Sequence, residues 1–133
     1  MTEVVIIDFD GTIVDHAFPE IGSPLPLAFE VMKELKEAGY KLILWTCRED
    51  DPHRIHKRYL EEAVAYCKAN GVEFDAVNES LPPEDFRPEH FVLRKPYGHY
   101  HIDDKNFGGF PGWHVVRAVL IENKQLYVVW NVI

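Results

Sequence analysis

Short apolar runs alternate along this chain with longer segments in which apolar residues recur at helical spacing. Four of the runs predict strands, at residues 4–8, 41–46, 74–77 and 99–104. The first two, VVIID and KLILWT, are apolar at almost every position, which is typical of strands buried on both faces of a parallel sheet. The hydrophobic pattern therefore favours a buried, mainly parallel sheet.

The segments between these strands carry the pattern of helices. In the first of them, Ser23 is a candidate N-cap with prolines in the first turn, and Gly39 suits the position just after the helix. The apolar residues of this helix are Leu27, Val31, Met32, Leu35 and Ala38. A second helix is expected to start at residues 51–52 and to end before Gly71, with an apolar face of Ile55, Tyr59, Ala63, Tyr66 and Cys67. A third helix is expected over residues 113–122 and a last strand over residues 125–132.

Strands that alternate with helices predict an α/β fold with a mainly parallel sheet, here in a single domain over residues 1–133. The carboxyl ends of parallel strands meet at one edge of the sheet, where such folds bind their ligands. Oxygen-bearing side chains follow three of the predicted strands at that edge, and they are Asp8, Asp10, Thr46, Asp103 and Asp104. We therefore expect these residues to converge on one site.

Composition and charge narrow the class of protein. Of the 133 residues, 47% are hydrophobic, which suits a sizeable core, and the formal net charge of −8 argues against broad binding to a nucleic-acid backbone. The two cysteines form no CxxC pattern and give no disulfide framework. The apolar runs are far shorter than a membrane span, and no charged-then-apolar leader is present. The expectation is a soluble cytoplasmic protein that binds neither membrane nor nucleic acid.

The converging aspartates indicate a divalent cation. Four carboxylates at one site would repel one another without a compensating charge. Mg²⁺ prefers oxygen ligands and attracts phosphate, which favours a magnesium-dependent phosphate site. Thr46 offers a hydroxyl donor and Lys95 a positive charge for a phosphate oxygen. Because a carboxylate can act as a nucleophile and a second one as general acid and base, Asp8 and Asp10 fit phosphoryl transfer.

The ordered motifs resemble those of the haloacid-dehalogenase-like (HAD) hydrolase superfamily. Residues 8–12, DFDGT after an apolar strand, match the first motif, and Thr46 after LILW matches the second. HIDDKN, residues 101–106, matches the fourth motif, an acidic pair after an apolar strand. Lys95 stands at a reasonable place for the lysine of the third motif, and Lys105 is the alternative. The resemblance spans residues 4–106.

This resemblance implies a role for each acidic residue. Asp8 would be the nucleophile and a Mg²⁺ ligand. Asp10 would be the general acid and base, with its backbone carbonyl on the metal. Asp103 would ligate Mg²⁺ directly or through water, with Asp104 supporting it.

The resemblance also implies a Rossmann-like three-layer fold in which Thr46 and Lys95 hold the transferring phosphoryl group. It gives no large cap domain, because residues 14–24 hold only a short flap and the core uses up most of residues 47–94. Walls of the substrate pocket are expected from residues 17–21 and 78–90. Capless members often shield the site by forming a homo-oligomer or act on large substrates, and both arrangements are open here.

Three functions fit these residues. The first is a Mg²⁺-dependent phosphatase that cleaves a small phosphomonoester through an aspartyl-phosphate. The alternative is a regulatory protein of the same fold that binds metal or phosphate with little or no turnover. The third is a phosphatase for nucleic-acid ends or phosphoproteins, and the acidic net charge weighs against nucleic acid.

Other candidate residues carry two interpretations each. Arg48, two residues after Thr46, either points at the site and binds substrate or is a surface cation. The histidine pairs lack a cysteine partner at the spacing of a zinc finger, which argues against zinc. Cys47 and Cys67 are expected to pack as small hydrophobic side chains.

Overall fold

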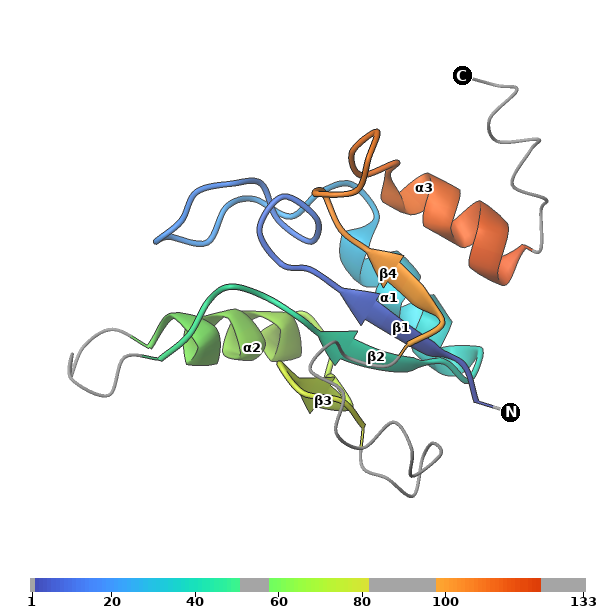
Figure 1. Cartoon of the computed structure of the whole chain (residues 1–133), viewed down its shortest axis with the longest axis horizontal. Coiled ribbons are helices and arrows are strands. Elements are labelled where there is room, and N and C mark those ends of the chain that lie inside the picture. The colour runs from blue at the N-terminus through green and yellow to red at the C-terminus, as the bar shows by residue number, and fades with distance from the viewer. Residues whose placement is uncertain (1, 51–57, 82–97, 123–133) are drawn as a thin grey trace.

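In the part of the chain that the structure describes, the sheet has four strands and all of them are parallel, as the sequence pattern predicted. The computed structural model describes residues 2–50, 58–81 and 98–122. Its strands are β1 (Val4–Ile7), β2 (Lys41–Leu44), β3 (Ala76–Val77) and β4 (Tyr100–Ile102), in the order β3-β2-β1-β4 (Figure 1). The structure thus confirms a Rossmann-like α/β fold.

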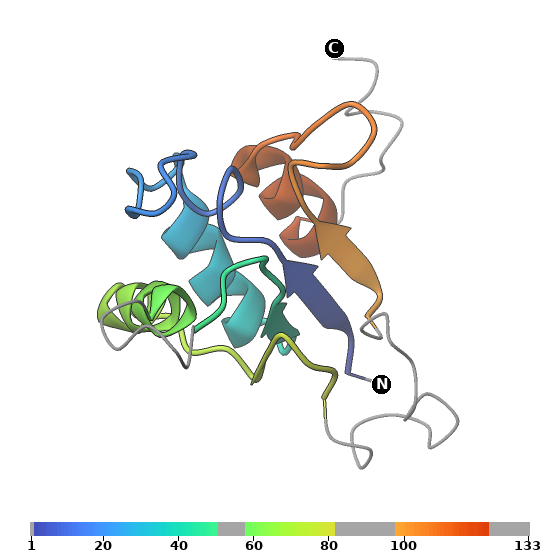
Figure 2. The same cartoon turned by 60° about the vertical axis from the view of Figure 1, so that its left-hand side comes forward.

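Alternate residues of the strands pack on opposite faces of the sheet. Val5 and Ile7 belong to the larger core, whereas Val4 and Ile6 belong to a smaller cluster on the other face. Three helices contribute buried residues to the larger core: α1 (Ala28–Glu37), α2 (Tyr59–Ala69) and α3 (Trp113–Val116). A π-helical segment, η3 (Arg117–Ile121), continues α3 and packs against this core. Figure 2 shows how these helices are arranged around the strands. The predicted three-layer fold also requires helices over the opposite face of the sheet, and the described residues do not test this. No large cap domain interrupts the described part of the fold.

The predicted start of the first helix is wrong. Residues 23–25 are extended and pair with the segment after β1: Asp15 donates its N–H to the carbonyl of Ser23 at 2.8 Å, and Leu25 donates to Ile13 at 2.9 Å. These backbone bonds outweigh the capping tendency of Ser23. The chain enters α1 only after Leu27, whose φ of 67° makes the turn. The pairing closes the base of the short flap expected at residues 14–24.

Most other predicted elements agree with the structure where it describes them. Gly39 and Gly71 directly follow the caps of α1 and α2 with φ of 99° and 91°, and residues 113–121 are helical. Cys67 is buried as expected, whereas the prediction for Cys47 is wrong because that side chain is exposed. The helix start at residues 51–52 and the last strand at 125–132 lie outside the described residues.

The order of the strands fixes where a ligand can bind. The chain passes from β1 to β2 on one side and returns much later as β4 on the other side of β1. In open parallel sheets, such a reversal leaves a crevice between the carboxyl ends of the two flanking strands. Asp8 follows β1 and Asp103 follows β4, so both stand where the strand order reverses.

A search of the described helices finds none that could cross a membrane.

Candidate active site

Three carboxylates form an acidic cluster where the strand order reverses. Oxygen atoms of Asp8, Asp103 and Asp104 all lie within 4.8 Å of one another. The strand pairing brings them together, because the N–H of Asp8 donates to the carbonyl of Ile102 at 3.0 Å and extends the β1–β4 ladder to the site. The arrangement is suited to a small hard cation, which takes oxygen ligands from two or three carboxylates.

Asp104 shows most directly that the cluster fits a cation. Its Oδ2 lies 2.7 Å from Nε2 of His16, but its buried Oδ1 has no hydrogen-bond partner. Buried polar atoms are seldom left unpaired in folded proteins, since the lost hydration is costly. Oδ1 of Asp103 accepts the backbone N–H of Lys105 at 2.8 Å, which fixes the loop that carries both residues. The donor set is therefore suited to Mg²⁺.

The carboxylates shift one another's protonation. Burial, then the charge of Asp103, raise the pKa of Asp8 to about 7. Burial alone would also raise the pKa of Asp104, but the hydrogen bond with His16, the largest of the opposing contributions, helps to lower that pKa below its usual value. The cluster without a metal therefore tends to keep a proton on Asp8 near neutral pH.

Gly11 is required by the close approach of the loop after β1 to the cluster. Its φ is +83°, and a Cβ at this position would collide with the side chains of His16 and Asp104. Trp113 supports the same loop, because its buried indole N–H donates to the carbonyl of Thr12 at 2.7 Å. The Gly11–Thr12 part of the loop is thus held between the side chain of Asp104 and α3.

Among the described residues, the hydroxyl group of Thr46 has no acceptor, so it can donate a hydrogen bond to a ligand. Its Oγ1 accepts the backbone N–H of Arg48 at 3.1 Å, and no described acceptor takes the hydroxyl proton. Thr46 lies beyond the carboxyl end of β2, the strand next to β1. This geometry is suited to donating a hydrogen bond to a phosphoryl oxygen.

Asn78 begins the segment that was expected to form one wall of the substrate pocket, but its bonds to the loop after β2 were not predicted. It follows β3, and its Oδ1 accepts the N–H of Thr46 at 2.8 Å while its Nδ2 donates to the carbonyl of Arg48 at 3.3 Å. Its φ of 52° is in the left-handed region, which asparagine tolerates better than most residues. An asparagine at the end of the third predicted strand was the available signal.

Asn78→Ala is expected to lower the free energy of unfolding by about 1–3 kcal/mol, because the N–H of Thr46 loses its partner and the left-handed backbone loses a favoured residue. Asn78→Asp is the comparison variant, since it keeps the acceptor for Thr46 and exchanges the donor to Arg48 for a charged carboxylate oxygen. Urea unfolding of both variants measures the difference. Equal losses in the two variants would contradict a specific role for the Thr46 bond.

The carboxylate of Asp10 lies apart from the acidic cluster. Its Oδ2 and Oδ1 accept hydrogen bonds from Nε and Nη2 of Arg48, both at 2.8 Å. Arg48 is 2% exposed, so the surface-cation interpretation is wrong. Lys95 lies outside the described residues, and Lys105 is exposed in the loop after β4, so the choice of phosphate-binding lysine stays a prediction.

The cavities differ in their relation to the site. One of about 250 Å³ lies beside the end of the flap and is lined by Leu25, Pro26, Phe110, Gly112, Trp113 and His114. A larger one, of about 590 Å³, lies at the amino ends of β1 and β2 and contains none of the candidate site residues. Of these two cavities, the smaller lies nearer to the site, because Trp113 in its lining bonds to the carbonyl of Thr12.

Comparison with solved structures shows that the chain is similar to a known protein. No family model and no curated protein matches the chain. The solved structure of a conserved protein from Bacteroides thetaiotaomicron is similar at 35% sequence identity, covers 98% of each chain and superposes with a TM-score of 0.80.

Fold and site together define a class, the parallel α/β proteins with an acidic candidate metal site at the carboxyl edge of the sheet. The identity and coverage place the chain more narrowly: it belongs to the family of the conserved Bacteroides protein.

Proposed function

We propose that this protein is a Mg²⁺-dependent phosphohydrolase of the HAD superfamily that cleaves a phosphomonoester through an aspartyl-phosphate on Asp8. The observation that carries the proposal is the cluster of Asp8, Asp103 and Asp104, with an unpartnered, buried Oδ1 on Asp104. It lies at the reversal of strand order, where parallel sheets bind ligands. The DFDGT motif supplies the aspartate pair that this chemistry needs.

Each step has a residue of this chain to perform it. A carboxylate oxygen of Asp8 attacks phosphorus, the bond from phosphorus to the leaving oxygen breaks, and Asp10 gives that oxygen a proton. Asp10 then takes a proton from water, whose oxygen attacks the phosphorus of the aspartyl-phosphate. The bond to Asp8 breaks, inorganic phosphate leaves, and both aspartates return to their starting forms.

Side chains around the nucleophile supply charge and orientation. Asp8, Asp103 and Asp104 would hold Mg²⁺, together with the backbone carbonyl of Asp10. When bound, the cation neutralises the carboxylates and the negative charge of the phosphoryl group. The Thr46 hydroxyl donates to a phosphoryl oxygen, and Lys95 is proposed as the cationic partner. Phosphoryl transfer depends chiefly on such positioning and charge stabilisation.

The proposal is tested with a panel of sugar phosphates, nucleotides, phosphoamino acids and p-nitrophenyl phosphate, assayed for phosphate release. Hydrolysis of at least one compound is expected with Mg²⁺, and a chelator should reduce it by at least about 10²-fold. Restored activity when Mg²⁺ is added back in excess controls for damage by the chelator. Hydrolysis that survives the chelator would contradict a metal-dependent mechanism.

One observation favours the alternative of a regulatory protein with little turnover. Both carboxylate oxygens of Asp10 accept bonds from buried Arg48, and a regulatory protein, which needs no proton donor, can keep this ion pair unchanged. Mg²⁺ binding by calorimetry without hydrolysis anywhere in the panel would support this alternative over the phosphatase.

A further inference from the structure

Arg48 is a buried charge that the proposed reaction does not use. It lies in the loop after β2, two residues beyond Thr46, and its side chain is 1% exposed. A buried guanidinium is costly unless it is paired and hydrogen-bonded. The contacts that stabilise Arg48 therefore indicate what it does.

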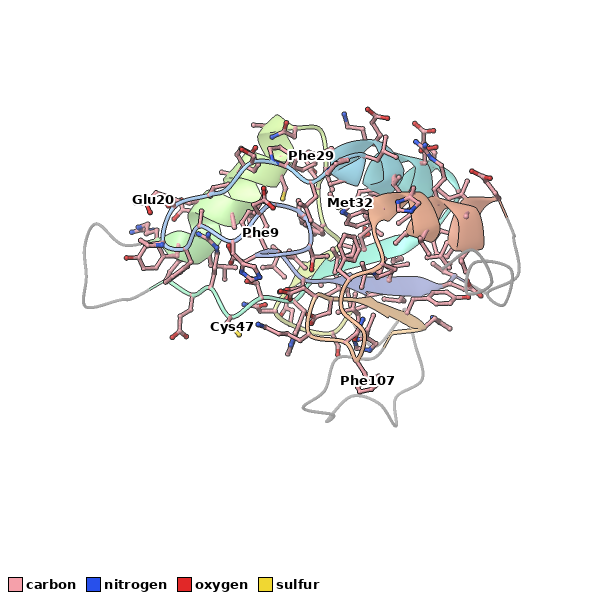
Figure 3. All side chains as sticks on the ribbon, turned by 90° about the horizontal axis from the view of Figure 1, so that it is seen from above. Phe9, Glu20, Phe29, Met32, Cys47 and Phe107 are labelled. Atoms are coloured by element: carbon pink, nitrogen blue, oxygen red, sulfur yellow. The ribbon has the colours of Figure 1, made fainter. Side chains whose placement is uncertain are left out.

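Those contacts run to two segments that flank the site. Nε and Nη2 bind the two oxygens of Asp10, and Nη2 also donates to the carbonyl of Glu20 at 2.8 Å. Nη1 donates to the carbonyl of Pro19 at 3.3 Å. Pro19 and Glu20 belong to the flap, which extends beside the loop of Cys47 in Figure 3. One side chain thus joins the loops after β1 and β2 to the flap.

Aromatic rings complete the surroundings of the guanidinium. The Cζ atom of Arg48 lies 5.0 Å from the ring centre of Phe9 and 5.1 Å from that of Phe18. Both distances are within the range of cation–π attraction. With four N–H bonds made and two rings against it, this group has little surface left for a substrate.

We propose that Arg48 is a positioning residue, which holds the carboxylate of Asp10 and the flap in fixed positions relative to each other. The proposal rests on the proposed function for its effect on turnover, but its structural part does not. Arg48 acts through Asp10, and its own backbone N–H on Thr46 Oγ1 ties the phosphoryl-binding hydroxyl to the same loop.

Lysine cannot replace this geometry. The guanidinium is a planar fork that binds a carboxylate through two parallel bonds, whereas an ammonium is a point charge. Arg48→Lys keeps the charge but loses the paired contact with Asp10 and at least one flap carbonyl. Since misplacement of a reacting group by about 1 Å can cost about 10²-fold in rate, kcat should fall by at least about tenfold. KM should change by less than about threefold, because Arg48 does not contact the substrate.

A double-mutant cycle with Asp10→Asn separates positioning from other effects. If Arg48 acts through Asp10, Arg48→Lys should lower kcat by less than about twofold in the Asp10→Asn background. Full additivity of the two losses would overturn the proposal, as would a rise in KM with kcat unchanged. Failure of both Arg48→Lys and Arg48→Gln to unfold cooperatively would show a structural role only and would also overturn it.

Arg117→Lys is the matched control. Arg117 forms a comparable pair with Glu34, with Nη2 to Oε2 at 2.7 Å, in the helical layer. Its replacement should leave kcat, KM and the cycle unchanged. An equal fall of kcat in this control would assign the effect to general loss of stability.

Hydrogen exchange distinguishes failure of this inference from failure of the proposed function. If the wild-type protein hydrolyses nothing in the panel, the phosphatase proposal fails, and amide exchange then decides the role of Arg48. Exchange in residues 16–22 should be at least about fivefold faster in Arg48→Lys than in wild type or Arg117→Lys. Unchanged exchange there would overturn the proposal even if turnover is observed.

Discussion

Asp8→Asn is expected to abolish phosphate release, lowering kcat by at least about 10³-fold, because the amide cannot attack phosphorus. The same substitution should stabilise the metal-free protein. Burial, with the charge of Asp103, raises the pKa of Asp8 to about 7. An ionised Asp8 at that place therefore costs free energy that a neutral amide of the same shape avoids.

The direction in which the stability changes with pH follows from proton binding by Asp8. Between the ordinary pKa of 3.8 and about 7, the folded protein holds a proton on Asp8 that the unfolded chain has lost. Stability from this group is thus present at acid pH, declines as pH rises through that window, and is gone above about 7. Asp8→Asn should accordingly gain about 1–2 kcal/mol at pH 8, measured by urea unfolding with chelator present. The gain should vanish near pH 4.

Asp15→Asn is the matched control, since Asp15 is an exposed aspartate of the flap. It should change both the free energy of unfolding and kcat very little. Turnover by Asp8→Asn within about tenfold of wild type would remove Asp8 as the nucleophile. A loss of stability at pH 8 would show instead that the charged carboxylate is well accommodated.

Mg²⁺ affinity should depend strongly on pH. A carboxylate must lose its proton to bind a cation, so the raised pKa of Asp8 makes binding release a proton below about pH 7. The apparent Kd should rise by about tenfold for each pH unit below that point and level off above it. Calorimetric titration with MgCl₂ from pH 5.5 to 8.5 measures this, and the heat in buffers of different ionisation enthalpy counts the protons released.

Asp8→Asn provides the control for the pH dependence. Its binding should be weaker at pH 8 and should lose most of its dependence on pH, because the titrating ligand is gone. An affinity of the wild-type protein that is constant over the whole range would contradict the role of Asp8 as a ligand.

Sequence reasoning succeeded where local pattern and sheet geometry act together. Asp8 and Asp103 lie far apart in the chain, yet both directly follow buried apolar strands. Because parallel strands end at a common edge, the clustering of the three carboxylates could be anticipated without coordinates. The strand order, which decides that β1 and β4 are neighbours, came only from the structure.

The sequence interpretations that the structure contradicts have a common physical cause. Ser23 has the character of an N-cap, but its carbonyl is taken by the N–H of Asp15 in a pairing that no local propensity reveals. A surface cation was one of the two interpretations of Arg48, yet bonds to Asp10 and to two flap carbonyls stabilise its buried charge. Contacts between distant segments override local preference in both cases.

The position of β4 also bears on how the protein matures on the ribosome. β1 and β2 are close in the chain and can pair while synthesis continues, but β4 joins β1 only through the ladder Val5–Tyr100 to Ile7–Ile102. A nascent polypeptide that ends before Tyr100 holds Asp8 without the two aspartates that complete the acidic cluster. The proposed cation site is consequently completed only late in synthesis, and truncated translation products would lack it.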